Sequence, residues 1–109
     1  MATSTLQCDR RWKGFQSVTG TTIIDITNLD YQELFIKVVV AGGTNMASVF
    51  LPKTTILTSG EYHRMGGWQT DANSELVVVS VSTTQVQLIS AFLNGSTYTS
   101  NARVSVYYR

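Results

Sequence analysis

The residues best suited to chemistry gather in one stretch, residues 61–75, which reads EYHRMGGWQTDANSE. It contains the only histidine of the chain, His63, and the only Gly-Gly-Trp sequence, Gly66-Gly67-Trp68. Three of the seven carboxylates also fall here, and they are Glu61, Asp71 and Glu75. A histidine beside carboxylates could transfer protons, and a glycine-hinged aromatic loop could bind a ligand.

The rest of the sequence supplies few partners for catalysis, and we expect no enzyme. A Ser-His-Asp triad would have to use His63, but no G-x-S-x-G turn presents a nucleophile. Cys8 is the only cysteine and lies in a polar N-terminal segment, which argues against a thiol enzyme. One histidine and one cysteine do not make a zinc site, and neither glycine pair precedes a phosphate-binding lysine. We therefore expect no metal and no cofactor.

One enzymatic alternative stays open at this point, although it is a distant one. A small glycan hydrolase would need a pair of carboxylates, and Glu61, Asp71 and Glu75 do fall in one region. No spacing among the three marks an acid–base pair, however. Asp71-Ala72-Asn73-Ser74 has the composition of an ordinary turn, and Glu75 is typical of a solvated start to a strand.

The same stretch offers a plausible set of ligand contacts. Aromatic faces stack on apolar ring surfaces, and planar donors and acceptors around them recognise hydroxyl groups. The candidate binding residues are Tyr62, His63, Arg64, Trp68, Gln69 and Asp71. We favour a structural interpretation, in which Tyr62 and Trp68 cap the open end of the core while His63 and Arg64 face solvent. The segment remains the best contact surface that the sequence suggests.

Alternation of apolar and polar residues dominates the chain, and helical spacing is nearly lacking. Turn residues separate short alternating runs about ten residues apart, which predicts an all-β fold of seven to nine strands. The expected architecture is an antiparallel β-sandwich, a jelly roll or a small barrel. Tyr31–Phe35 could instead form a helical turn. The expected strands are Arg11–Val18, Thr22–Thr27, Glu33–Ala41, Met46–Leu51, Thr54–Leu57, Glu75–Ser82, Thr84–Leu93, Ser96–Thr99 and Ala102–Arg109.

The alternation also predicts which side chains share a face of their strand. These sets are Ile24 and Ile26; Leu34, Ile36, Val38 and Val40, which form an inward face; Val86, Leu88, Ser90 and Phe92; and Ala102, Val104, Val106 and Tyr108. Two strands are apolar on both faces, with Phe35 and Val39 opposite the second set, and Leu76 and Val78 opposite Val77, Val79 and Val81. Such a strand is either fully buried at the centre of the fold or covered by another subunit.

Composition limits the partners. The net charge is +1 and only 14% of residues are charged, so we expect no nucleic-acid binding, which usually needs a clustered basic face. Fifteen threonines and eleven serines supply the polarity instead. The first residues lack the apolar core of a signal peptide, and the longest apolar run, Val38–Ala41, is too short to insert in a membrane. We expect a flexible segment, 1–10, and a single β-domain, 11–109.

Three stretches together resemble one family of proteins. They are FLPKTT at residues 50–55, GEYHRMGGW at residues 60–68 and the aromatic-basic RVSVYYR at residues 103–109. Over residues 20–109 the chain resembles the small β-domains of bacteriophage tail fibres, head fibres and related virion appendages. The first twenty residues depart from a full-length fibre, because they show neither collagen-like nor coiled-coil repeats.

The resemblance implies a non-enzymatic phage or prophage protein located in the virion. It also implies a homo-oligomer, with a trimer favoured, that attaches to a host-surface glycan or protein or assembles with other virion proteins. The main alternative is a monomeric carbohydrate-binding module.

Overall fold

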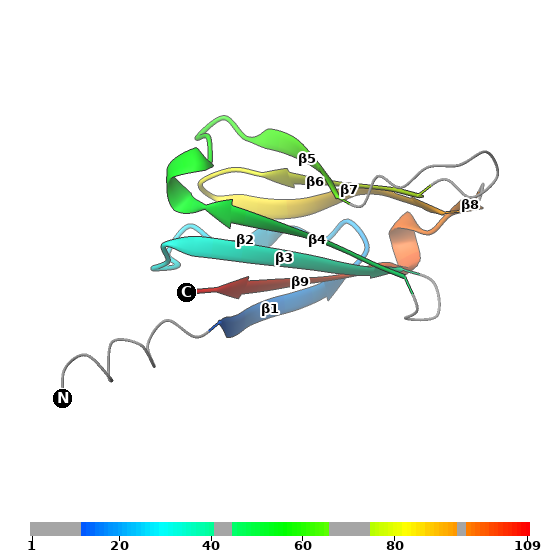
Figure 1. The fold of residues 1–109 in the computed structure, drawn as a ribbon, viewed down its shortest axis with the longest axis horizontal. Helices are drawn as coiled ribbons and strands as arrows, with labels where there is room; N and C mark the ends of the chain where they lie inside the picture. The colour runs from blue at the N-terminus through cyan, green and yellow to red at the C-terminus, as the bar shows by residue number, and fades with distance from the viewer. Residues whose placement is uncertain (1–11, 41–44, 66–74, 94–95) are drawn as a thin grey trace.

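The computed structural model describes residues 12–40, 45–65, 75–93 and 96–109 (Figure 1). The expected flexible segment 1–10 lies outside these residues, and so do Gly42-Gly43 and Asn94-Gly95. The pairing of Leu93 with Ser96 does bring together the two strands on either side of the Asn94-Gly95 position.

Within the described residues the chain is built from short strands and two single 3₁₀ turns. The strands are β1 (Lys13–Thr19), β2 (Ile24–Asp25), β3 (Glu33–Val40), β4 (Asn45–Pro52), β5 (Glu61–Met65), β6 (Glu75–Val81), β7 (Gln85–Leu93), β8 (Ser96–Thr97) and β9 (Arg103–Tyr108). The 3₁₀ turns are η1 (Lys53–Thr55) and η3 (Thr99–Asn101).

The strands form two antiparallel sheets. Sheet A has the order β1-β9-β3-β4, and sheet B has the order β2-β7-β6-β5, with β8 pairing with β7 near its end. In Figure 1 the strands of sheet A lie side by side, with β5, β6 and β7 above them. The chain changes sheets between β1 and β2, between β2 and β3, and between β4 and β5, and it returns to sheet A at β9. The expected antiparallel β-sandwich is confirmed.

Strand β3 shows why this sequence folds into sheets. Its residues alternate between fully buried and half-buried positions, because successive side chains of a strand point to opposite faces. Leu34, Ile36, Val38 and Val40 are the buried set, as predicted. They meet the valines of β6 and the inward residues of β7 in one hydrophobic cluster. Burial of each such side chain away from water stabilises the folded state by about 1.5–3 kcal/mol.

One local expectation was wrong after β4, and one open alternative before β3 is not realised. Thr54–Leu57 was expected to be a strand, but Lys53–Thr55 forms the 3₁₀ turn η1. Pro52 ends β4, and the Thr55 hydroxyl donates to the Pro52 carbonyl at 2.7 Å, so local hydrogen bonds replace a ladder. The alternative helical turn at Tyr31–Phe35 is not formed either, since β3 begins at Glu33.

The prediction that Val86, Leu88, Ser90 and Phe92 share one face of β7 was wrong beyond Leu88. Val78 pairs with Ser90 and Val79 pairs with Leu88, so Ile89 is an extra residue that forms a β-bulge. The bulge reverses the alternation, because one added residue exchanges the two faces of a strand. Ala91 is therefore buried, while Ser90 and Phe92 are only half-buried.

The two strands that are apolar on both faces are central in their sheets. Strand β3 lies between β9 and β4, and β6 lies between β7 and β5. Their second faces are not fully buried, because Phe35, Val39, Leu76 and Val78 are all half-buried. The prediction of a fully buried central strand was therefore wrong for these outer faces, and each sheet carries apolar side chains on its outer surface.

Ile23 and Ile24 allow a matched test of this sandwich. Ile24 is fully buried in the core, whereas the side chain of Ile23 is 48% exposed. We expect Ile24→Ala to lower the free energy of unfolding by about 2–5 kcal/mol through lost burial and a residual cavity. Ile23→Ala should change it by less than about 0.5 kcal/mol. Urea unfolding of both variants measures the difference, and equal losses would contradict the assigned faces.

Candidate functional site: an aromatic face on sheet A

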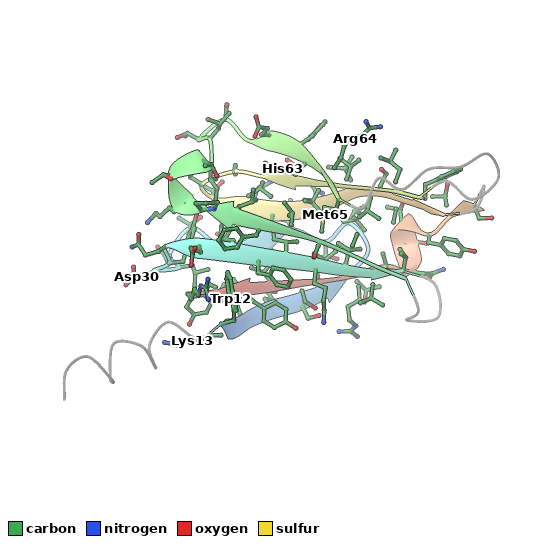
Figure 2. All side chains as sticks on the ribbon, viewed as in Figure 1. Trp12, Lys13, Asp30, His63, Arg64 and Met65 are labelled. Carbon is green, nitrogen blue, oxygen red and sulfur yellow. The ribbon has the colours of Figure 1, made fainter. Side chains whose placement is uncertain are left out.

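The segment that the sequence singled out is only partly described. Trp68, Gln69 and Asp71 lie outside the described residues, so their predicted roles stay predictions. Tyr62, His63 and Arg64 lie on β5, the edge strand of sheet B. Figure 2 shows His63 and Arg64 at the opposite side of the sandwich from Trp12.

Strand alternation separates the three described candidates on β5. The side chain of Tyr62 is 69% exposed, so its predicted role as a cap on the core was wrong. His63 is the more buried residue, with a side chain that is 17% exposed and an Nε2 atom 3.6 Å from Glu61 Oε1. Arg64 is exposed, while Met65 at the end of the strand is buried. The expectation that His63 faces solvent together with Arg64 was wrong, because neighbours on a strand alternate.

Local hydrogen bonds hold one of the described carboxylates, Asp25. Asp25 accepts a hydrogen bond from the backbone amide of Thr27 at 2.9 Å. The Thr27 side chain and this amide hold the pKa of the Asp25 carboxyl below its usual value. Asp25, the last residue of β2, therefore binds the turn that follows it, and its lowered pKa makes its carboxyl a poor general acid.

A metal-binding cluster and a membrane-spanning helix are both absent from the described residues. These residues contain no cluster of three or more His, Cys, Asp or Glu side chains that could hold a metal ion. In the same ranges, no helix has the length and apolar character needed to cross a bilayer.

A different surface gathers the aromatic side chains. The register of sheet A places Phe35 of β3 opposite Phe50 of β4 on one side and Tyr107 of β9 on the other. Trp12, which precedes β1, lies over this row, with ring centroids 5.7 Å from Phe35 and 5.8 Å from Phe50. We call Trp12, Phe35, Phe50 and Tyr107 the aromatic face.

The rings of the aromatic face are tilted against one another and not stacked flat. Trp12 meets Phe35 at 47° and meets Phe50 edge-on at 90°, and Phe35 meets Tyr107 at 48° over 6.1 Å. Tilted and edge-on arrangements suit the ring quadrupoles and hold the side chains in place. Phe50 is 45% exposed, and the other three rings are half-buried. The cluster is therefore ordered by its own contacts and still reaches solvent.

Two cations border the aromatic face. The guanidinium carbon of Arg109 lies 4.3 Å from the Trp12 ring centroid, while its Nε donates to Glu33 Oε1 at 2.6 Å. Backbone hydrogen bonds between Glu33 and Arg109 hold the two residues side by side. The Nζ atom of Lys37 lies 5.9 Å from the centroid of the Tyr107 ring, one row further along the sheet. Cation–π attraction orders both side chains against the rings.

A hollow of about 290 Å³ opens among these side chains, and Trp12, Phe35, Lys37 and Tyr107 line it. We call it the Lys37 hollow. A second hollow, of about 230 Å³, lies along β1 and β9 on the other side of Tyr107. It follows the β-bulge at Phe15, where the pairing of β1 with β9 shifts by one residue. The surface of sheet A is thus both aromatic and contoured, which suits the binding of a ring-shaped or extended ligand.

The sequence contained signals for this site, although reasoning from it missed the site. Phe35 stood on the non-core side of an otherwise aliphatic strand, and Tyr107 lay in the aromatic-basic RVSVYYR segment. Trp12 shared its expected strand with Phe15, and Phe50 was the only aromatic residue of its own. Only the order β1-β9-β3-β4 brings the four together, and the sequence did not specify that order.

Comparison of the chain with protein-family models, with curated proteins and with solved structures found no match. The function is therefore proposed from the fold, the site and the sequence resemblance described above.

The ion pair beside Trp12 makes a measurable prediction. Both side chains of the Glu33–Arg109 pair are about one-third exposed. We expect Glu33→Gln to lower the free energy of unfolding by less than about 1 kcal/mol at low ionic strength, because exposed pairs are weak. The loss should shrink in 1 M NaCl, which screens surface charges. Urea unfolding at the two salt concentrations measures it, and a salt-independent loss would contradict an electrostatic role.

Proposed function

We propose that this chain is a non-enzymatic attachment domain of a phage or prophage virion appendage, which binds a host-surface ligand through the aromatic face of sheet A. The observation that carries the proposal is the convergence of Trp12, Phe35, Phe50 and Tyr107 on one accessible surface. A virion context is the expectation from the sequence resemblance, and the attachment role rests on the geometry.

The aromatic face supports binding more directly than it supports catalysis. Its rings offer apolar surface at a low cost in conformational entropy, which is why aromatic residues dominate binding surfaces. Glu33, two residues before Phe35 on β3, is engaged by Arg109 at 2.6 Å. The four rings and their two bordering cations therefore offer stacking surfaces and positive charge, which suit binding more than proton transfer.

Self-association is the second part of the proposal, with a trimer favoured. The outer face of sheet B carries a second apolar surface, to which Leu76, Val78 and Phe92 contribute half-buried side chains. A second copy of the chain could cover this surface and leave the aromatic face of sheet A free. Three linked sites would raise the overall affinity for a repetitive cell surface without any new contact in each site.

The attachment role can be tested by binding of labelled protein to a panel of bacterial cells. We expect Trp12→Ala to weaken binding to a susceptible strain about tenfold, as loss of a central aromatic contact does. Tyr62→Ala is the matched control, because Tyr62 is an exposed aromatic on the opposite sheet. Circular dichroism should show that both variants remain folded. Loss of binding in Tyr62→Ala and not in Trp12→Ala would refute the assigned surface.

Solution mass tests the oligomer. Three copies of the 12.0 kDa chain give about 36 kDa by sedimentation, which is the value that we expect. Val78→Glu should reduce the mass to that of one chain, because a charge at the outer face of β6 opposes burial against a partner. A wild-type monomer that still attaches to cells would favour a monomeric carbohydrate-binding module instead.

A further inference from the structure

We propose that the Lys37 hollow binds a single sugar ring that carries a carboxylate, such as a uronic acid. The inference rests on the proposed function, since it takes the aromatic face as the attachment surface. It goes further by naming the chemical class of the ligand and the residue that selects it.

The size and walls of the hollow suit one saccharide ring. Its volume of about 290 Å³ lies just below the range of about 300–1,000 Å³ that small-molecule pockets span, so it has room for a small ligand only. Three of its four lining residues are aromatic, and Phe35 is tilted by 47° to Trp12 and 48° to Tyr107. The C–H face of a pyranose is weakly positive, so it stacks on the negative face of such rings.

Lys37 sets the charge of the ligand. Its ammonium lies over the Tyr107 ring at 5.9 Å, and it is half-buried at the wall of the hollow. The ion pairs found in the described part of the chain are His63–Glu61 and Arg109–Glu33, so Lys37 has no carboxylate partner there. An ammonium in this position repels the cationic ligands that aromatic cages otherwise favour. It attracts an anion and can donate a charge-assisted hydrogen bond to a carboxylate.

Hydroxyl groups continue the surface beyond the hollow. Lys37 pairs in register with Ser48 of β4 and with Ser105 of β9. Ser105 Oγ lies 3.0 Å from Ser17 Oγ, which extends the row to β1. A row of serines beside a row of aromatic rings offers hydrogen bonds to the hydroxyls of neighbouring sugars. The arrangement therefore fits one residue of a longer acidic glycan.

The same face fits a single-stranded nucleic acid less well, although aromatic rings also stack on bases. A nucleic acid requires several cations along its phosphates. Here the Arg109 guanidinium is paired with Glu33, the Arg103 guanidinium donates to Ser17 Oγ at 3.2 Å, and the net charge of the whole chain is only +1. One ammonium beside one hollow matches a single carboxylate better than a phosphate backbone.

The test compares two sugars that differ at one group. Methyl β-D-glucuronide and methyl β-D-glucoside share a ring, and only the first has a carboxylate. We expect isothermal titration of the full chain to show about tenfold tighter binding of the glucuronide, the effect of one charge-assisted hydrogen bond. Lys37→Gln should remove this preference, and Lys37→Arg should restore most of it.

Lys53→Gln is the matched control. Lys53 also lies over a tyrosine, with its Nζ 5.0 Å from the Tyr31 ring centroid, but it does not line the hollow. This variant should keep the full preference for the glucuronide. Equal loss in Lys53→Gln and Lys37→Gln would overturn the assignment, because it would point to a general effect of positive charge.

The outcomes separate this inference from the proposed function. If the wild-type chain binds both sugars with equal affinity and Trp12→Ala loses this binding, the carboxylate specificity is wrong. The aromatic face would still be the attachment surface. Cell attachment that depends on Trp12 without binding of either sugar would overturn the saccharide and indicate a protein ligand. If the chain binds an oligothymidylate more tightly than the glucuronide, the saccharide proposal is wrong and the ligand is a nucleic acid. If attachment itself is independent of Trp12, the proposed function fails first.

Discussion

The register of β3 between β4 and β9 is the constraint on which both the core and the candidate site depend. Ile36 pairs with Val49 and Val106, and these inward positions form part of the core. The same register places Phe35 in line with Phe50 and Tyr107 on the outer face. A slip of one residue would exchange the two faces of the strand. The free energy of burying the aliphatic set therefore also fixes the position of the aromatic rings.

Patterns that depend on neighbouring residues in the chain could be predicted from the sequence. The alternation of β3, the inward Ile24 and Ile26, and the buried Ala102 and Val104 before and within β9 all follow from a period of two. The prediction from this alternation was wrong where the chain departs from regular strand pairing. The bulge at Ile89 depends on how β7 meets β6, and the 3₁₀ turn after Pro52 depends on local hydrogen bonds. Neither the bulge nor the 3₁₀ turn is marked by the amino-acid composition of its segment, so the sequence pattern did not reveal them.

The candidate site was harder to predict than the fold, for a physical reason. Reasoning from the sequence grouped residues that are close along the chain, and so it chose the stretch around His63. On a strand, neighbours such as Tyr62 and His63 point to opposite faces, so closeness in sequence works against convergence. The aromatic face instead takes one residue from each of four separate segments, and strand order decides which segments are adjacent. A single sequence does not determine that order.

Hydroxyl-radical footprinting of the cell-attached chain tests the central claim most directly, because it reports on the binding surface without any substitution. Exposed aromatic side chains are oxidised readily, and a bound ligand protects them. The account predicts reduced oxidation of Trp12, Phe50 and Tyr107 on attachment, while the exposed Tyr62 on sheet B is oxidised as in the free protein. Protection of Tyr62 with unchanged oxidation of Trp12 and Tyr107 would contradict the assignment of the aromatic face as the attachment surface.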